Sequence, residues 1–501
     1  MNILFVYSLN NAYPPLKPLP TIKYLQFGIS YISSFLKSRG HNTKLVVLSR
    51  FSGRKNKIII DTYLRSFRPE VICFTAVATE YDFISNIAKY IKKQYPDIFL
   101  LIGGTHVSLN PEHVLDGGFD ALCVGEGENP ALELVTQLEG GLKPSRIPNL
   151  WIKNGLETEK NPPRHFLENL DNLPFPDREM WKEWIANADS DQRCAILLGR
   201  GCPFQCAYCC NHVLRKLAPG NYVRLRSTGN IIDELRDIVL KFPEKNQIYF
   251  EIETIGINKQ WAIELCSKLA AFNDMVRRSL SYSVNLRITP AADYNDLFHV
   301  FKKSNFKFIN IGLESGSERV RREILRREYS NQDIINAVDR ARKNGLQVNF
   351  FNLIGIPGET ISDFKETVKI NRLCQPDRQG NYIFFPYPGT DLYAVCKTRG
   401  LLKHPINSHK IIERVNAVLD LPGFSRKQIQ KSYIWFDYYV YRGYKPLGRL
   451  LTTVLKNILK SNYYLNKYIY QKILFHRSLH KLLLIYKKIF GLNAISQKAP
   501  I

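Results

Sequence analysis

Three of the ten cysteines lie in one short stretch, Gly199-Arg200-Gly201-Cys202-Pro203-Phe204-Gln205-Cys206-Ala207-Tyr208-Cys209. Their spacing is C-x3-C-x2-C, and the stretch follows a β-prone run at residues 194–198. Thiolate clusters of this density usually hold a metal. A structural zinc site needs four closed donors, whereas three protein ligands leave one position for a small molecule. The stretch therefore predicts a metal centre with an open position, which is what an active site requires.

The same stretch resembles the radical S-adenosylmethionine (SAM) superfamily, whose C-x3-C-x-aromatic-C loop holds a [4Fe–4S] cluster. Cys202, Cys206, Tyr208 and Cys209 match this motif residue for residue. The resemblance implies that the three thiolates bind the cluster and that SAM chelates its fourth iron. It also implies reductive cleavage of SAM to a 5′-deoxyadenosyl radical.

Two side chains beside the motif bear on this interpretation. A zinc knuckle is the alternative, and His212 would then be the fourth ligand. Cys210 directly follows the motif, but consecutive residues on an extended loop tend to point apart. We therefore expect Cys210 to take no part in the site.

Length and composition set the broad class of the protein. The 501 residues suffice for roughly two to four domains, and 45% of them are apolar, as in a globular protein. No secretory signal and no apolar run of about 18 residues is visible in the sequence, so we expect neither export nor a membrane span. Ten cysteines with a metal-type cluster favour a reducing compartment, the cytoplasm.

Residues 1–142 alternate strand-like and helix-like runs. Strands are predicted at residues 3–8, 43–48, 71–76, 98–103 and 121–124, and helices at 24–38, 59–67, 82–94 and 130–138. This alternation predicts an α/β domain of the Rossmann or flavodoxin-like, doubly wound type. In such a domain, ligands bind beyond the carboxyl ends of the strands.

Glycines follow two of these predicted strands. Gly103 and Gly104 end the fourth, and Gly125 and Gly127 follow the fifth. Glycines at such positions let the backbone approach a bulky ligand closely. Because these turns precede the cysteine motif, residues 1–400 resemble the cobalamin-binding-domain radical SAM family. The resemblance implies that the first domain carries the corrinoid through these glycines.

One familiar signature of cobalamin domains is missing. The motif D-x-H-x-x-G, whose histidine coordinates cobalt, would follow the first strand, but residues 8–15 read Ser-Leu-Asn-Asn-Ala-Tyr-Pro-Pro. The resemblance then implies cobalamin binding without a histidine below the metal, and a domain that has lost cobalamin is the alternative. His106 stands at a strand end, where a hydrogen-bonding loop residue is more usual than a cobalt ligand.

Residues 143–190 are richer in proline and asparagine and are predicted to be a connecting segment. In residues 191–400, six strands are predicted at 194–198, 247–251, 282–288, 308–313, 348–354 and 382–385. Six such units match the partial (βα)6 barrel of the radical SAM family. Active residues are expected at the carboxyl ends of its strands.

Several strand-end residues match SAM-contacting positions of the family: Glu251, Glu253, Asn285, Arg287, Glu314 and Gly355. By resemblance, an acid of the first pair accepts a hydrogen bond from the SAM ammonium, and the second pair contacts the carboxylate or ribose. Glu314 would hold ribose hydroxyls or a polar substrate, and Gly355 would approach the adenine. The alternative for each is a capped, solvated strand end. No residue is assigned to catalysis itself.

Residues 401–501 are predicted to form a basic, aromatic helical region. The formal net charge is +25, and fifteen of the seventy Lys and Arg residues lie from residue 426 onward, against the single acid Asp437. Such helices suit an anionic membrane surface, and the same composition could bind RNA. We favour the membrane over nucleic acid because no RNA-binding module is visible. A helical cap over the barrel mouth is the alternative to both.

The family resemblance implies a cytoplasmic methyltransferase, peripheral at the membrane if the C-terminal region binds lipid. It would use a [4Fe–4S] cluster, SAM and cobalamin to methylate an unactivated carbon or phosphorus centre of a small-molecule or lipid-like substrate. A donor such as flavodoxin or ferredoxin would supply electrons. The alternatives are a non-methylating or cobalamin-independent radical SAM enzyme, acting by rearrangement, cyclisation or RNA modification, and a non-catalytic protein that only holds corrinoid or cluster.

Overall fold

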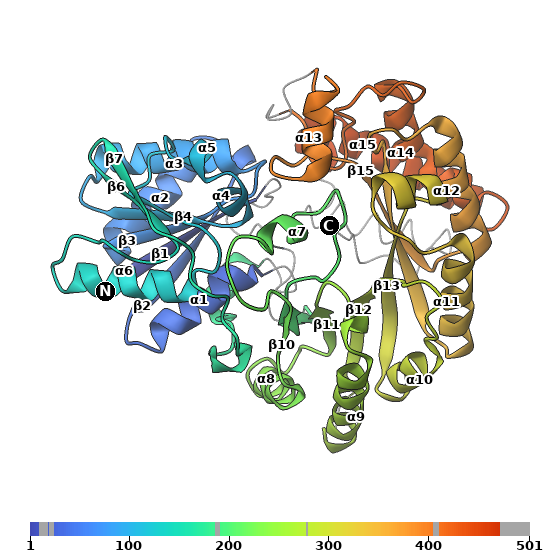
Figure 1. Cartoon of the computed structure of the whole chain (residues 1–501), viewed down its shortest axis with the longest axis horizontal. Coiled ribbons are helices and arrows are strands. Elements are labelled where there is room, and N and C mark those ends of the chain that lie inside the picture. The colour runs from blue at the N-terminus through green and yellow to red at the C-terminus, as the bar shows by residue number, and fades with distance from the viewer. Residues whose placement is uncertain (10–18, 20–24, 186–190, 277–278, 404–409, 471–501) are drawn as a thin grey trace.

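The computed structural model describes residues 1–9, 19, 25–185, 191–276, 279–403 and 410–470. Two parallel sheets form two lobes, and a helical C-terminal region lies beside the second sheet (Figure 1). We call residues 1–160 the first lobe and residues 191–403 the second lobe. One continuous apolar core includes buried residues from both sheets.

The first sheet has the strand order β2-β1-β3-β4-β5-β6-β7. Its parallel strands are β1 (Asn2–Leu9), β2 (Asn42–Ser49), β3 (Val71–Thr75), β4 (Phe99–Gly103) and β5 (Ala121–Cys123). The helices of this lobe are α1 (Phe27–Lys37), α2 (Lys55–Phe67), α3 (Tyr81–Gln94), α4 (Thr105–Leu109), α5 (Pro111–Val114) and α6 (Glu128–Glu139). Helices cover both faces of the sheet, which is why β1 carries a run of buried apolar residues instead of alternating ones.

The predicted doubly wound fold is confirmed, with the 2-1-3-4-5 order of flavodoxin-like sheets. The predicted strands and helices are present, with ends that differ by a few residues. The expectation of a plain connecting segment over residues 143–190 is wrong for residues 150–160. There β6 (Leu150–Asn154) and β7 (Glu157–Lys160) form a hairpin that extends the sheet antiparallel to β5. The dipeptide Asn154-Gly155, a known hairpin signal, could have revealed it.

The second sheet is entirely parallel, with the order β15-β14-β13-β12-β11-β8. Its strands are β8 (Arg193–Leu197), β11 (Gln247–Glu251), β12 (Ser281–Leu286), β13 (Phe306–Glu314), β14 (Gln347–Ile354) and β15 (Arg378–Ile383). The connecting helices are α8 (Thr228–Lys241), α9 (Lys259–Met275), α10 (Asn295–Lys303), α11 (Asn331–Lys343) and α12 (Ile361–Cys374). Because β8 and β15 are the two ends of this order, the sheet is the predicted open, partial barrel, with helices along its outer side (Figure 1).

A short antiparallel ribbon follows β8. It consists of β9 (Gly199–Arg200) and β10 (Arg224–Leu225), and the one-turn helix α7 (Asn211–Leu214) lies between them in the chain. Short 3-10 helices are found at Arg50–Ser52, Leu170–Asn172, Glu179–Trp184 and Ile255–Ile257, and short π-helices at Val320–Ile324 and Asn466–Tyr470. The ribbon holds the start of the cysteine motif at the carboxyl end of β8.

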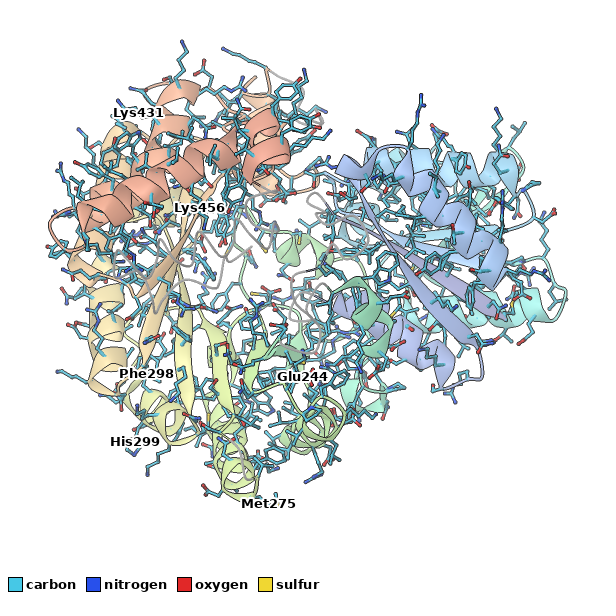
Figure 2. The ribbon with its side chains drawn as sticks, turned by 180° about the vertical axis from the view of Figure 1, so that it is seen from behind. Glu244, Met275, Phe298, His299, Lys431 and Lys456 are labelled. Atoms are coloured by element: carbon cyan, nitrogen blue, oxygen red, sulfur yellow. The ribbon has the colours of Figure 1, made fainter. Side chains whose placement is uncertain are left out.

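The C-terminal region is helical where it is described. After α13 (Asp391–Thr398) come α14 (Arg426–Tyr441), α15 (Leu447–Ser461) and α16 (Tyr463–Leu465). Helix α14 packs against α12 and β15, and α15 packs against α14. Figure 2 shows α14 and α15 from behind, with Lys431 and Lys456 labelled on them. Within the described ranges, no helix is both long and apolar enough to span a membrane, and the leucine-rich segment at residues 482–488 lies outside those ranges.

Candidate functional site

The cysteine motif follows β8 and begins in the β9–β10 ribbon. Cys206 is buried, and Cys202 and Cys209 are partly exposed. Burial raises the pKa of Cys202 to about 11, and Glu253 and the other two thiols of the motif raise it further. The three thiols are therefore close enough to act on one another electrostatically.

Cys209 is more readily ionised than Cys202. Its pKa is lowered to about 7 by a hydrogen bond from the Cys210 thiol, which outweighs burial. The backbone N–H and the side-chain amide of Asn211 also approach Cys209 Sγ, each at 3.5 Å. The expectation that Cys210 points away from the motif is wrong, because the local turn places its thiol against Cys209.

The donor set fits an iron–sulfur cluster better than a single zinc ion. In the part of the chain that is described, no group of three His, Cys, Asp or Glu side chains could hold one metal ion. His212 Nε2 lies 3.0 Å from Asp391 Oδ1, so this side chain is engaged elsewhere. Cluster ligands bind separate iron atoms and accept hydrogen bonds at sulfur. Three neighbouring thiols with N–H donors suit that role without converging on one point.

Tyr208 belongs to a buried network with Glu314 and Arg327. The Tyr208 hydroxyl donates to Glu314 Oε1 at 3.0 Å, and Arg327 Nη1 donates to the same oxygen at 2.9 Å and to the hydroxyl at 2.6 Å. Glu314 has φ of 59°, a backbone conformation that a non-glycine residue keeps only when its surroundings hold it there. Arg327 was not found from the sequence because it lies in a loop with no strand-end signal.

Arg287 lies directly against the cysteine motif. Its Nη1 is 2.6 Å from Cys206 Sγ, and its guanidinium lies 3.8 Å from the centre of the Phe204 ring. A cation over an aromatic face is held electrostatically by the ring. Arg287 therefore places a permanent positive charge beside the thiols.

Asn285 shares a strand face with Arg287 but has a different environment. Its Oδ1 accepts hydrogen bonds from Tyr249 at 2.8 Å and from Asn310 at 3.0 Å, and its Nδ2 donates to the Ile252 carbonyl at 3.1 Å. Asn349 continues this ladder by donating to Asn310 at 2.8 Å. These side chains cross the inside of the open barrel as a polar floor beneath the cysteine motif.

Gly355 lies at the carboxyl end of β14, as expected for the predicted glycine. Its φ is +81°, and a Cβ there would lie 2.8 Å from the Ile429 side chain of α14. The Gly355 and Ile356 N–H groups donate to Glu359 at 2.6 and 3.1 Å. Glu359 is fully buried, and burial raises its pKa to about 8. This turn is thus held rigidly by packing and hydrogen bonds.

A cavity of about 480 Å³ lies between the carboxyl ends of the two sheets. From the first lobe it is lined by all four predicted glycines, Gly103, Gly104, Gly125 and Gly127. From the second lobe it is lined by residues at the ends of β8, β9 and β11, namely Leu197, Gly199, Arg200, Gly201, Glu251, Ile252 and Glu253. Burial raises the pKa of Glu253, although a hydrogen bond with Asn211 opposes this.

The cavity fits a large, flat cofactor. Gly104 has φ of +103°, and a Cβ there would lie 2.7 Å from Thr75 Oγ1. A Cβ at Gly127 would lie 2.8 Å from Ile32 Cδ1. Apolar side chains that include Phe5, Phe74 and Leu101 line the same space. The first lobe therefore offers backbone edges and apolar surface, which suit the rim and face of a macrocycle.

No histidine is found among the described residues that line the cavity. His106 Nε2 instead lies 3.2 Å from His113 Nδ1, and burial lowers the pKa of His106 to about 4. His106 is thus a hydrogen-bonding residue, as the sequence favoured, but it lies in helix α4 and not in a loop. Most of the stretch at residues 8–15, where the missing histidine motif would stand, lies outside the described residues.

Four charged residues beside the cavity were given no role in the sequence analysis: Glu126, Glu128, Arg200 and Arg224. Glu126 and Glu128 alternate with the predicted glycines, and they form ion pairs with Arg200 and Arg224 of the β9–β10 ribbon. Burial alone would raise the pKa of Glu126, but the two guanidinium groups lower it below its usual value. Only their positions beside glycine and cysteine motifs could have drawn attention to these residues.

Comparison with known families decides the identity of the two lobes. The model of the radical SAM superfamily matches residues 196–370, and that of the B12 binding domain matches residues 23–135. The chain is a radical SAM enzyme with a B12-binding domain. A radical SAM domain takes a [4Fe–4S] cluster and SAM, and a B12-binding domain takes cobalamin, so these are its cofactors.

Several proteins resemble this radical SAM enzyme over much of its length. An uncharacterized methyltransferase of Pyrococcus horikoshii is 27% identical over 82% of this chain and 87% of its own. The anaerobic magnesium-protoporphyrin IX monomethyl ester cyclase of Rubrivivax gelatinosus is 23% identical over 73% of this chain and 65% of its own. The hopanoid C-3 methylase of Methylococcus capsulatus is 25% identical over 73% of this chain and 67% of its own.

A solved structure shares the fold. It is the radical SAM methyltransferase TsrM from Kitasatospora setae with cobalamin and a [4Fe–4S] cluster bound. The TM-score is 0.61 at 16% identity, over 80% of this chain and 75% of that chain. At this identity the likeness establishes the architecture of the two lobes.

Proposed function

We propose that this radical SAM enzyme is a cobalamin-dependent methyltransferase that acts on an unactivated carbon or phosphorus centre. The single observation that carries the proposal is the cavity, where the glycine-lined end of the first sheet faces the end of the second sheet beside the cysteine motif. The names of the methyltransferase relatives support it. When bound, the cluster supplies the electron that cleaves SAM, and cobalamin supplies the methyl group for transfer.

The chain's own residues would bind and orient these groups. We propose Cys202, Cys206 and Cys209 as cluster ligands, braced by Tyr208 through its hydrogen bond with Glu314. Arg287 would place a positive charge against the cluster and the SAM carboxylate. These roles follow the family motif and the contacts described above.

The remaining predicted residues divide between the two cofactors. Glu251 and Glu253 line the cavity and would face SAM as acceptors. Gly355 follows β14 and, by the family resemblance, would face the adenine. The four cavity glycines would hold the corrinoid by backbone contact. Asn285 is satisfied within the polar floor, so we assign it to support of the site and not to direct contact with SAM.

We propose the following domain division. The corrinoid-binding domain, predicted over residues 1–142, extends to residue 160 because β6 and β7 belong to its sheet. The connecting segment ends at residue 190, the barrel covers residues 191–400, and the C-terminal helical region covers residues 401–501. Expression of residues 1–160 and measurement of corrinoid binding would test the first boundary against the shorter fragment 1–142.

The test of the function is anaerobic purification with cobalamin supplied, followed by cluster reconstitution. We expect about one corrinoid and four irons per chain, and formation of 5′-deoxyadenosine and S-adenosylhomocysteine from SAM. The cob(II)alamin EPR spectrum should lack nitrogen coupling from a lower ligand. A protein that cleaves SAM but retains no corrinoid would contradict the proposal and would favour chemistry of the non-methylating kind, as the similarity to the cyclase also allows.

We also propose peripheral membrane contact through α15. Leu447, Leu451, Leu455 and Ile458 recur at helical spacing on one face of this helix and are 40–60% exposed. An apolar face of this kind on a basic region suits an anionic lipid surface, and a lipid-like substrate would then be within reach. Helix α14 contributes the fully buried Phe436 and Val440 to the core, so a test of membrane binding must leave α14 unchanged.

The sharpest test of membrane contact changes only the exposed face. We expect the wild-type protein to sediment with vesicles that contain anionic lipid, and the double variant Leu451→Glu, Leu455→Glu to remain in the supernatant. Thr452→Glu lies on the same helix outside the apolar face and serves as the control for adding an acidic side chain to this helix. Equal sedimentation of all three proteins would refute the proposal.

We further propose a cytoplasmic protein that receives electrons from a donor such as flavodoxin or ferredoxin. All ten cysteines are free, as expected in a reducing compartment. Reduction of the reconstituted cluster by each donor, followed by optical spectroscopy under anaerobic conditions, tests the second part.

A further inference from the structure

A cluster of four charged side chains joins the two lobes beside the cavity. Arg200 donates to Glu126 Oε1 at 2.9 Å and to Glu128 Oε1 at 2.5 Å. Arg224 donates to both oxygens of Glu126, at 2.9 and 3.1 Å. Both acids come from the turn between β5 and α6 in the first lobe, and both arginines come from the β9–β10 ribbon of the second. We call these four residues the interlobe ion cluster.

The cluster is built to hold one geometry. Arg200 and Arg224 are directly opposite each other in the ribbon, and Glu126 lies between these two like charges. Glu126 and Glu128 together balance the two positive charges. The Leu167 N–H donates to Glu126 Oε2 at 2.9 Å, and Arg224 donates to the Leu167 carbonyl at 2.8 Å. Glu128 and Arg224 are nearly fully buried. Buried ion pairs hold when each charge has such partners, and a planar guanidinium also fixes orientation.

Both ends of the cluster are tied to a cofactor site. Gly125 and Gly127 of the cavity alternate with Glu126 and Glu128 in one turn. On the other side, only Gly201 separates Arg200 from Cys202. Gly201 has φ of +85°, and any Cβ there would collide with the Tyr222 carbonyl, so this link has little freedom. A shift of Arg200 therefore moves the cysteine motif relative to the cavity glycines.

We propose that Arg200 is a positioning residue that sets the distance and orientation between the cluster site and the corrinoid site. The inference rests on the proposed function, in which radical formation and methyl transfer share one cavity. Misplacement of reacting groups by about 1 Å can cost roughly 100-fold in rate. The ion cluster thus serves the relative placement of the two cofactors, in addition to the cavity lining that Glu126, Glu128 and Arg200 provide.

A second bridge between the lobes provides a matched control. The Thr79 hydroxyl donates to Glu413 at 2.6 Å, and Asn110 donates to the Pro388 carbonyl at 3.1 Å. This bridge connects the first lobe to Pro388 of the second lobe and to Glu413 of the C-terminal region, beyond β15, which is at the opposite end of the second sheet from β8. Thr79→Val therefore weakens the contact of the first lobe with the rest of the chain without touching the cysteine motif.

The experiment compares Arg200→Lys, Glu128→Gln and Thr79→Val with wild type after loading with both cofactors. Arg200→Lys keeps the charge but cannot bridge both acids in a fork. We expect iron and corrinoid contents within about twofold of wild type in all variants. In Arg200→Lys, and less so in Glu128→Gln, the reduced cluster should lose most of its enhancement of cob(II)alamin EPR relaxation, which depends on the distance between the two centres. Thr79→Val should keep it.

Hydrogen exchange supplies a readout that needs no corrinoid. We expect Arg200→Lys to raise amide exchange together in residues 125–128 and 199–209, and Thr79→Val to leave both segments unchanged. Unchanged relaxation and exchange in Arg200→Lys would overturn the inference, as would loss of both cofactors in this variant or equal effects of Thr79→Val. If the wild-type protein retains no corrinoid but Arg200→Lys still raises amide exchange in both segments, only the proposed function is refuted.

Discussion

The carboxyl ends of the two sheets meet at one cavity but present different chemistry. The first sheet presents glycines and apolar side chains, so its contribution is space and backbone. The second sheet presents thiols, Arg287 and buried acids, so its contribution is specific atoms held by hydrogen bonds. A macrocycle needs room, whereas a cluster needs ligands. The end of the first sheet should therefore lose its corrinoid when side-chain volume is added there. The end of the second sheet should lose its cluster when a ligand atom is removed.

The largest effect is expected from loss of a motif thiol. Cys206→Ala removes a buried sulfur, and two thiolates are not enough to retain the cluster. We expect iron content and the visible absorption of the cluster after reconstitution to fall at least about tenfold, with SAM cleavage abolished. Corrinoid retention should change less than twofold, because the cavity glycines are untouched.

Cys210→Ala is the matched control for this experiment. The Cys210 thiol contacts Cys209 but lies outside the C-x3-C-x2-C spacing. We expect this variant to keep at least half of the iron. Retention of the cluster by Cys206→Ala, or its loss in Cys210→Ala, would show that the ligand set is wrong.

The converse effect is expected when volume is added to the first sheet. Gly127→Val would push a branched side chain against Ile32 and into the cavity. We expect corrinoid retention to fall about tenfold, measured by the optical spectrum of the purified protein, with iron content unchanged. Gly229→Ala in α8 has only an ordinary contact at 3.9 Å and serves as the control. Equal corrinoid content in the two variants would contradict the idea that the first sheet contributes space for the corrinoid.

A smaller effect, on stability, is expected from the buried network behind the cysteine motif. Arg327→Met leaves Glu314 as a buried charge without its ion-pair partner. Removing one member of such a pair costs about 3–5 kcal/mol. The neighbouring Arg326→Met breaks an exposed pair with Asp391, worth about 0–1 kcal/mol. In thermal denaturation under argon, Arg327→Met should melt at a clearly lower temperature than Arg326→Met. Similar melting temperatures would show that the buried network does not stabilise the fold.

Much of the fold could be predicted because periodic apolar patterns report burial on the faces of strands and helices. The cysteine motif and the cavity glycines were also found, since both depend on local spacing. The hairpin at residues 150–160 was missed because both strands are short and β7 has no apolar residue, which confines the apolar alternation to β6. Arg327 and Arg224 were missed for another reason: their partners lie 13 and 98 residues away, and no local pattern records such a pairing.

The smallest effect, on the pH dependence of stability, concerns Glu359 in the turn beyond β14. Here backbone N–H groups of the second sheet's end hold a buried carboxyl. The carboxyl accepts hydrogen bonds from Gly355 and Ile356, and burial raises its pKa to about 8 from its usual value of 4.5. Between these two pH values the unfolded chain has released the proton that the folded chain still holds. Stability therefore falls as pH rises through this window, at a rate on the order of 1 kcal/mol per pH unit.

Glu359→Gln should flatten this dependence, because glutamine keeps an oxygen acceptor for the two N–H groups but does not titrate. We expect the melting temperature of the reconstituted wild-type enzyme to drop between pH 6 and pH 8 by several degrees more than that of the variant. Glu366→Gln changes a partly exposed acid on α12 and should follow the wild type. If Glu359→Gln also follows the wild type, this carboxyl is ionised in the folded protein, and the turn beyond β14 presents a charge and not a neutral acceptor to the adenine side of the site.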